Sequence, residues 1–280
     1  MTDKEHSASI DKKGLVRDLQ TLGLGRGHWV AVHSSMKSIG WVEGGPQTVI
    51  EALIETVGDR GGVMIPLFTQ ARVENIDLAV TPSYLGLLPE TFRRFPGVVR
   101  SANPTHSVGI YGPGAAGIAE AHRRTSFIGR GSPWDHLAGL DGRVLHIGTN
   151  FNTSSILHLA EVYAQVPYLD VPYPAWENGV GARHTDGSRL YCPPREVPGD
   201  SVMFYLVQEE MDRRGLLRIG QVGQADSVLA RAKDMLAVGV EMLRSDPAVL
   251  LCHAEDCRVC TLSRRLLEKI MKEKTGSGGS

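Results

Sequence analysis

The spacing of apolar residues alternates between helical and strand-like patterns along the N-terminal part of the chain. Residues 15–22 place apolar side chains at helical intervals, and residues 29–33 follow as a short β-rich run. An amphipathic stretch over residues 48–57 is followed by a continuous apolar run over residues 62–67, which is typical of a buried strand. The pattern predicts helix, strand, helix and strand in turn.

The same alternation continues into the middle of the chain. Residues 87–95 and 154–164 have helical spacing, whereas residues 107–111 and 143–147 have the pattern of strands. We therefore expect an α/β fold with a mixed, largely parallel central sheet flanked by helices. Ligands of such sheets gather beyond the carboxyl ends of the strands. The loops at these ends follow His33, Leu67 and Gly148.

The C-terminal part departs from this alternation. Residues 167–200 are rich in Pro, Gly, Tyr and Trp without a clean period, which predicts loops and a short hairpin that form a small lobe. Helical spacing returns after this lobe, and a final helix is expected over residues 262–274. We expect residues 1–274 to form a single domain, with a Cys-rich segment at 252–274 and a flexible tail at 275–280.

Composition and charge narrow the classes of partner. The chain is 42% hydrophobic and 22% charged, and no apolar run approaches the roughly 20 residues that cross a bilayer. Residues 1–13 are polar and charged, so no secretory signal is legible and we expect a cytoplasmic protein. The formal net charge of -1 lacks the basic field that nucleic acid requires. Neither nucleic acid nor a membrane is an expected partner.

The first candidate segment consists of Ser34, Ser35, Met36 and Lys37, which leave a predicted strand. Successive backbone N–H groups, hydroxyls, a lysine and the start of a helix can together hold a pyrophosphate. The segment lacks the spacing of a Walker or dinucleotide-binding fingerprint. An ordinary serine-rich turn between strand and helix is the alternative interpretation.

The second candidate is His158, which lies about one turn into the helix expected over residues 154–164. A polar loop with several capping residues precedes it, so the imidazole can face the mouth of the sheet. Glu161 lies three residues later on the same face and could orient the ring or join a buried network. A structural histidine of the core or surface is the alternative.

Two carboxylates, Glu196 and Asp200, lie on a stretch rich in loops. We expect one of them to accept the Nδ1 proton of His158, which would leave Nε2 free to take a proton from an amine. A turn-forming aspartate and an ion pair with Arg195 are the alternatives.

Three cysteines, Cys252, Cys257 and Cys260, follow a C-x4-C-x2-C spacing near the C-terminus. The closing C-x2-C is a familiar half-site for zinc, and a structural zinc ion is one interpretation of the segment. His253 or the distant Cys192 could supply a fourth ligand. Reduced thiols without metal are the alternative, because structural disulfides are rare in cytoplasmic proteins.

Five stretches together resemble the aminoglycoside 3-N-acetyltransferase family, which has the antibiotic N-acetyltransferase fold. They occur in the family's order between about Leu15 and Leu243 and comprise residues 33–46, 100–108, 131–133, 152–161 and 220–223. Each motif alone is weakly specific, whereas five in order over most of the chain are a specific signal.

The resemblance implies transfer of an acetyl group from acetyl-CoA to the 3-amino group of an aminoglycoside. It implies that His158 is the general base. It also implies that acetyl-CoA is held by the 34–37 segment and by the residues around Pro104, Ser107 and Val108. The transfer would be direct, since CoA thiolate is a good leaving group, and the protein would be a monomer or homodimer.

The chain departs from the family in two respects. Family members usually carry their partner carboxylate in a pair of acids one residue apart, whereas Val197, Pro198 and Gly199 separate Glu196 from Asp200 here. Antibiotic-modifying members are commonly more acidic than this almost neutral chain. N-acylation of another amine, such as an amino-phosphonate or a biosynthetic intermediate, and non-catalytic binding of CoA are therefore the alternative functions.

Overall fold

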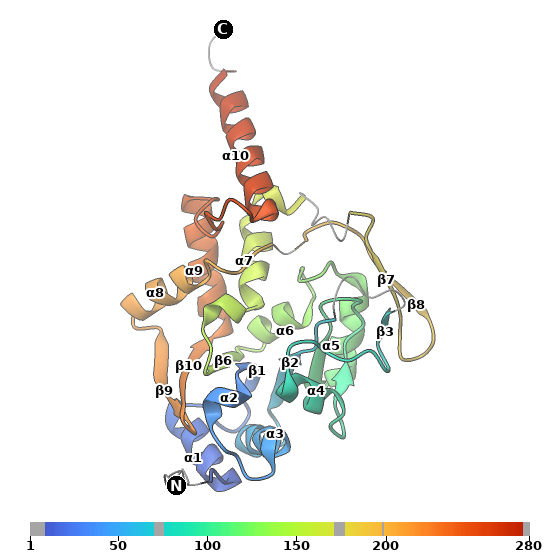
Figure 1. Ribbon diagram of the computed structural model, residues 1–280, viewed down its shortest axis with the longest axis vertical. Coiled ribbons are helices and arrows are strands. Elements are labelled where there is room, and N and C mark those ends of the chain that lie inside the picture. Colours follow the sequence, from blue (N-terminus) through green and yellow to red (C-terminus); the bar gives the residue numbers. More distant parts are fainter. Residues whose placement is uncertain (1–8, 70–75, 171–176, 198, 277–280) are drawn as a thin grey trace, which may run out of the picture.

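The structure is a computed structural model that describes residues 9–69, 76–170, 177–197 and 199–276. Its centre is a seven-stranded sheet with the order β4-β5-β2-β1-β6-β10-β9 (Figure 1). Its strands are β1 (Trp29–Ser34), β2 (Gly62–Pro66), β4 (Val99–Arg100), β5 (Val108–Tyr111), β6 (Arg143–Ile147), β9 (Leu217–Val222) and β10 (Ala225–Arg231).

Only the middle of this sheet is parallel. β1 pairs in parallel with both β2 and β6, whereas β5, β4, β10 and β9 are added antiparallel at the two sides. The mixed α/β class is therefore confirmed, but the parallel share of the sheet is smaller than expected. The carboxyl ends of β1, β2 and β6 still meet at one edge, which is where parallel strands concentrate ligand-binding loops.

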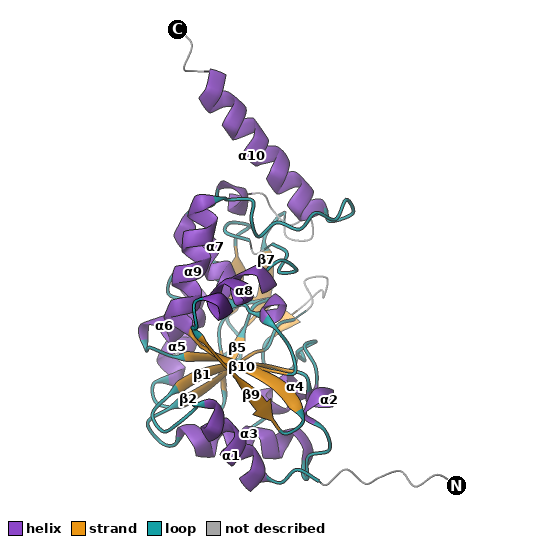
Figure 2. Cartoon of the chain, turned by 90° about the vertical axis from the view of Figure 1, so that its left-hand side faces the viewer, coloured by secondary structure: helices purple, strands orange, loops and turns teal. Residues whose placement is uncertain are grey.

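Helices cover both faces of the sheet (Figure 2). Alternate side chains of β1 point to opposite faces, so Val30 and Val32 pack in one core while Ala31 packs in the other. One core involves α1 (Lys12–Leu22), α3 (Gly45–Val57) and α4 (Leu87–Arg93). The other involves α5 (Ala115–Ala121), α6 (Pro133–Gly139), α7 (Ile156–Ala164), α8 (Tyr205–Arg213) and α9 (Ala232–Ser245).

A second sheet has three strands in the order β3-β7-β8. The strands are β3 (Ile76–Asp77), β7 (Val180–Arg183) and β8 (Arg189–Cys192), and the last two form an antiparallel hairpin. This hairpin lies in the 167–200 segment, where sequence pattern predicts a small lobe. Its partner β3 comes from much earlier in the chain and pairs in parallel with β7.

The expectation of helical structure after the lobe is wrong for residues 217–231, which form the β9–β10 hairpin. Gly223 lies at its turn with a positive φ of 61°, a conformation that glycine adopts without strain. α10 (Arg258–Gly276) begins before the expected helix and includes the first two residues of the expected tail. The rest of that tail, residues 277–280, lies outside the described residues.

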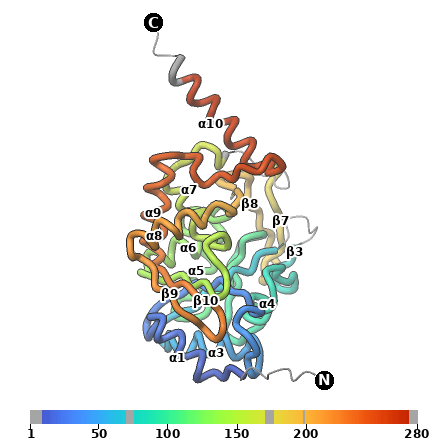
Figure 3. Tube along the Cα trace, turned by 60° about the vertical axis from the view of Figure 1, so that its left-hand side comes forward, coloured from blue at the N-terminus to red at the C-terminus, as the bar shows by residue number. Residues whose placement is uncertain are grey.

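The ends of the described chain lie far apart. Helices α1 and α10 occupy opposite ends of the molecule, and α10 projects beyond the main body (Figure 3). Among the described helices, none combines the length and apolar character that a membrane span requires.

Candidate active site

A cavity of about 270 Å³ opens at the edge where the parallel strands end. Its walls are contributed by segments far apart in the sequence. They include His33 and Ser34 of β1, Pro66 and Phe68 at and after the end of β2, Thr149, Thr153 and Ser155 before α7, and Ser201 before α8. The cavity therefore lies where the sheet topology places ligand-binding loops.

The loops after β1 and β6 are packed tightly together at this edge. The backbone N–H of Ser35 donates to the carbonyl of Ile147 over 2.9 Å, and the Ser38 hydroxyl donates to that of Ser35 over 2.9 Å. Met36 begins the single-turn helix α2 (Met36–Ile39), and the Lys37 side chain is exposed. Ser34 is thus the residue of the 34–37 segment that borders the cavity, and Lys37 is exposed to solvent.

Gly148 allows this close packing. A Cβ atom at Gly148 would lie 2.3 Å from Cβ of Ser38, and the residue has a φ of 62°. A larger residue would push the two loops apart, because such a contact is far inside van der Waals distance.

The second segment predicted to hold the cofactor, around Pro104, Ser107 and Val108, packs against the chain that follows β2. Ser107 and Val108 are fully buried. The Ser107 hydroxyl donates to the carbonyl of Leu67 over 2.8 Å and accepts from Nε of Arg100 over 2.9 Å. The Pro104 carbonyl accepts from the Thr69 hydroxyl over 2.7 Å. Ser107 therefore braces the chain after β2, and cofactor contact by Pro104, Ser107 and Val108 stays a prediction.

His158 lies in the first turn of α7 and is held by a short chain of hydrogen bonds. Its Nδ1 atom is 2.8 Å from Oε2 of Glu161, and Oε1 of Glu161 accepts from the Tyr168 hydroxyl over 3.2 Å. A carboxylate only accepts, so Nδ1 carries the hydrogen and Nε2 keeps a lone pair. Burial raises the pKa of Tyr168, so its hydroxyl remains a donor.

The surroundings of His158 are largely apolar. Its side chain is 11% exposed, and the ring packs edge to face on Phe204 with centroids 4.7 Å apart. Glu161 is 1% exposed and both of its oxygens are hydrogen bonded. A buried carboxylate with these partners fixes the orientation of the imidazole, as in proton-transfer sites of other folds.

Glu196 and Asp200 do not occupy the position expected for them. Glu196 accepts a hydrogen bond from the Ser126 hydroxyl over 2.6 Å. Asp200 accepts from the backbone N–H of Val202 over 2.8 Å and from the thiol of Cys257 over 3.3 Å. Glu161 holds the Nδ1 atom of His158 instead, and the i, i+3 spacing on one helix was the sequence signal for that pairing.

Two buried histidines lie beneath the cavity. His33 and His146 are register partners on β1 and β6, and their rings stack with centroids 5.0 Å apart. The ring of Trp134 in α6 also stacks on His33, with centroids 5.9 Å apart. Burial lowers the pKa of His33 to about 3 and that of His146 well below its ordinary value, so both rings are neutral. His146 and Trp134 are not among the site residues predicted from the sequence.

His106 is the other imidazole near the site. Its Nδ1 atom lies 2.9 Å from the Thr105 hydroxyl, and its ring packs on Phe68 with centroids 4.5 Å apart. Burial, followed by the charges of His158 and His122, lowers its pKa well below the ordinary value. His106 is thus less suited than His158 to accept a proton from a ligand.

The three C-terminal cysteines come together, with Asp200 as the fourth member of the cluster. One ligand atom from each of Asp200, Cys252, Cys257 and Cys260 lies within 4.8 Å of the others. The two fourth ligands considered from the sequence are elsewhere. Cys192 accepts a weak hydrogen bond from Asn103 over 3.9 Å, and His253 is exposed.

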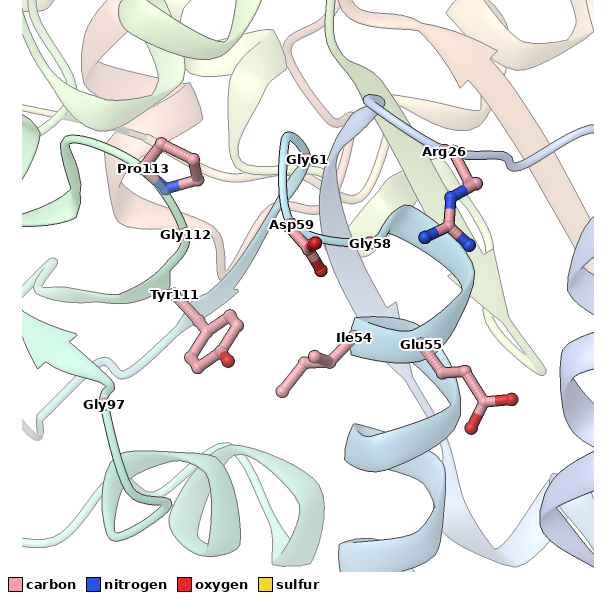
Figure 4. Close-up of a pocket in the computed structure, with 10 residues that line it drawn as sticks. All are labelled: Arg26, Ile54, Glu55, Gly58, Asp59, Gly61, Gly97, Tyr111, Gly112 and Pro113. Carbon is pink, nitrogen blue, oxygen red and sulfur yellow. The ribbon is translucent and has the colours of Figure 1, made fainter.

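A larger cavity of about 570 Å³ lies at the opposite edge of the sheet (Figure 4). It is bordered by Arg26 before β1, by the Gly58–Gly61 turn before β2 and by Tyr111 at the end of β5. None of the site residues predicted from the sequence lines it. The predicted residues that line a cavity do so at the carboxyl edge.

Comparison with known proteins shows the family of the chain. A family model described as aminoglycoside 3-N-acetyltransferase matches residues 31–244. The chain is 35% identical over 264 residues to aminoglycoside N(3)-acetyltransferase VIII of Streptomyces fradiae, which covers 84% of this chain and 92% of that protein.

Solved structures show the same fold. One is a histidine-to-alanine variant of the aminoglycoside acetyltransferase AAC(3)-IVa in complex with gentamicin. It has a TM-score of 0.81 and 30% identity, with 94% of this chain and 99% of that chain covered. Another is AAC-IIIb in a binary complex with CoASH, with a TM-score of 0.73, 27% identity and coverage of 85% and 97%.

Proposed function

Because the chain belongs to the aminoglycoside 3-N-acetyltransferase family, we propose that it transfers an acetyl group from acetyl-CoA to the 3-amino group of an aminoglycoside. The observation that carries this proposal is the Tyr168–Glu161–His158 chain, which leaves Nε2 of one imidazole free for proton transfer. Its location at the carboxyl edge of the sheet supports it further, because a cavity opens there.

His158 acts as the general base. An aliphatic amine is mostly protonated at neutral pH, and only the neutral form attacks a thioester. Nε2 of His158 takes a proton from the amine as the nitrogen approaches the carbonyl carbon. Glu161 fixes the tautomer through Nδ1 and stabilises the imidazolium that forms, while Tyr168 holds the other carboxylate oxygen.

The start of α7 stabilises the thioester oxygen as it gains charge. α7 begins at Ile156 directly after Ser155, and the N–H groups of Leu157 and His158 donate to the carbonyls of Ser154 and Ser155, so the Ile156 N–H is the donor proposed for this oxygen. Ser155 borders the cavity. Backbone N–H groups directed at a developing oxyanion are worth several kcal/mol in acyl transfer, about 3 kcal/mol for one donor.

The 34–37 segment holds acetyl-CoA. Ser34 borders the cavity and Lys37 is exposed beside it, so a hydroxyl, backbone N–H groups and an ammonium are available to the phosphates. AAC-IIIb, a neighbour of the same fold, has been solved with CoASH, which supports CoA as the donor here. No covalent intermediate on the enzyme is required, since CoA thiolate leaves directly.

An aminoglycoside is the acceptor that the family favours, and the neighbour solved with gentamicin supports it. The near-neutral net charge of this chain provides little long-range attraction for a polycation, which is the observation that favours another amine as a second candidate. The cytoplasmic pool of acetyl-CoA would serve either reaction.

The experiment is a turnover assay that follows release of free CoA thiol from acetyl-CoA. Purified chain is incubated with a panel of aminoglycosides and, separately, with small amino-phosphonates and amino sugars. Mass spectrometry and NMR of the product identify the acetylated nitrogen. Thiol release with the aminoglycosides, dependent on His158, is the expected result. Release only with another amine would replace the acceptor, and CoA binding without any release would contradict the proposal.

A further inference from the structure

We propose that one structural zinc ion is bound by Asp200, Cys252, Cys257 and Cys260. This ion links the C-terminal segment to the residues that hold His158 in place. The four ligand atoms lie within 4.8 Å of one another although Asp200 is far from the cysteines in sequence. Sγ of Cys257 lies 3.3 Å from Oδ2 of Asp200 and donates to it.

The spacing of these atoms fits a tetrahedral ion. With Zn–S bonds of about 2.3 Å, neighbouring ligands of a tetrahedral zinc lie roughly 3.8 Å apart, so small side-chain movements bring all four into place. Cys257 directly precedes α10 and Cys260 lies in its first turn, which is how a C-x2-C pair directs two thiolates at one ion. Thiolates and a carboxylate are both established zinc ligands.

The environment is that of a closed structural site. Cys252 and Cys260 are buried, and Cys257 and Asp200 are half-buried. Three thiolates and a carboxylate in so small a volume would repel one another at low dielectric, and a divalent cation would offset that repulsion. Arg264 donates to the carbonyls of Leu251 and Cys252, which fixes the loop that carries the first cysteine and places a positive charge beside it.

The cluster is joined to His158 from two directions. Asp200 leads through a short segment to Phe204, whose ring packs on the imidazole at 4.7 Å. α10 packs against the 3-10 helix Pro167–Asp170, which carries the Tyr168 that donates to Glu161. A metal that ties Asp200 to the start of α10 therefore holds both the apolar wall and the hydrogen-bonding support of His158.

Whether the metal binds does not depend on the proposed function. Only the effect of the metal on His158 rests on that proposed function. Metal readouts therefore come first. Protein purified without chelators should carry about one zinc per chain by elemental analysis. Cobalt(II) added to metal-free protein should give the intense visible bands of tetrahedral thiolate coordination. Neither zinc nor a tetrahedral cobalt spectrum, in protein shown to be folded and reduced, would overturn the proposal.

Variants test the ligand set. Cys260→Ser and Asp200→Asn should each lower zinc affinity by at least about 10- to 100-fold. That is the usual cost of losing a residue that only supports a metal ligand, and loss of a direct ligand costs at least as much. Cys192→Ser, which removes the described cysteine outside the cluster, and Asp212→Asn, an exposed carboxylate on α8, should keep full zinc content. Unchanged affinity in Asp200→Asn would remove Asp200 from the site.

Asp200→Cys separates a metal ligand from a group that acts on the substrate. A thiolate can replace the carboxylate on zinc, so this variant should keep one zinc and most of its turnover. Full zinc content with turnover as low as that of Asp200→Asn would mean that Asp200 acts directly on the chemistry, and would overturn its assignment as a structural ligand. Removal of zinc from the wild type should lower kcat by a larger factor than it changes the KM for acetyl-CoA.

Discussion

The two edges of the central sheet each carry a cavity, and the larger one is not the candidate site. At the amino edge, about 570 Å³ is bordered by Arg26, Asp59 and Tyr111. At the carboxyl edge, about 270 Å³ is bordered by His33 and Ser155, and His158 lies in the first turn of α7, which begins directly after Ser155. Size alone would choose the wrong edge.

The edges differ in how their polar groups are held. Arg26 and Asp59 are exposed, and water screens charges of that kind. His158 is 11% exposed and its partner Glu161 is 1% exposed, with hydrogen bonds of 2.8 and 3.2 Å that fix both. A buried, hydrogen-bonded imidazole with one free nitrogen is organised for proton transfer, whereas an exposed ion in an open hollow is not.

His158→Ala should have the largest effect on turnover, and it tests whether the carboxyl edge carries the active site. It should lower turnover by about 10²- to 10⁴-fold at neutral pH, the usual cost of losing a general base, while acetyl-CoA still binds. The loss should shrink at high pH, where more of the amine is already neutral. Steady-state rates over pH and calorimetry with acetyl-CoA provide the measurement. Near-wild-type turnover would exclude His158 and make His106→Gln the next variant.

Glu161→Gln tests the positioning of the base with a smaller expected effect. Glutamine keeps the shape but loses the charge that stabilises the imidazolium, so kcat should fall about 10- to 100-fold with KM for acetyl-CoA unchanged. Tyr168→Phe should cost less, because it removes only the support of the carboxylate. Glu196→Gln is the matched control on a carboxylate bonded to Ser126. A larger loss in Glu196→Gln than in Glu161→Gln would reverse this assignment.

The elements and side-chain pairs that depend on local spacing could be predicted from the sequence. β2 is a continuous apolar run and β6 is mainly apolar, both with glycine at or next to their ends, and His158 with Glu161 is a pair within one helical turn. The β9–β10 hairpin was missed because β9 is an edge strand. Most of its residues are exposed or half-buried, so the apolar alternation of a strand is absent.

The parts that failed depend on contacts between distant segments. Asp200 meets Cys257 across 57 residues, and Glu196 meets Ser126 across 70, so nothing near either acid indicates its partner. The hydrogen bonds of Ser107 to Arg100 and Leu67, which approach from other strands and loops, have no local signal either. Such long-range pairings are set by tertiary packing and carry no local pattern.

Acid should destabilise the interior of the sheet through its buried histidines. Burial lowers the pKa of His33 to about 3 and of His122 to about 4, below the ordinary value of 6.5. The unfolded chain therefore binds more protons between these values, and the free energy of unfolding falls as pH drops below about 6.5. Each such histidine contributes up to about 1.4 kcal/mol per pH unit.

Urea unfolding at several pH values between 7 and 4 measures this slope. His33→Gln should make it shallower, because glutamine takes up no proton in either state. His136→Gln, on a half-buried ring of α6, is the matched control for the substitution itself. A stability that does not depend on pH below 6 would contradict neutral, buried imidazoles at the sheet.

The smallest effects are expected for variants at the amino edge of the sheet, where the larger cavity lies. These variants test whether that edge takes no part in the reaction. Arg26→Gln and Asp59→Asn change exposed side chains that border the larger cavity. β1 separates them from Ser34 by about 16 Å at the usual rise per residue of a strand. Surface changes of this kind usually alter stability by less than about 0.5 kcal/mol, and no buried hydrogen bond of the His158 network is affected. Turnover and acetyl-CoA affinity should stay within about twofold of the wild type. A tenfold loss in either variant would mean that the amino edge takes part in the reaction or is coupled to it, and the distinction drawn between the two edges would then be wrong.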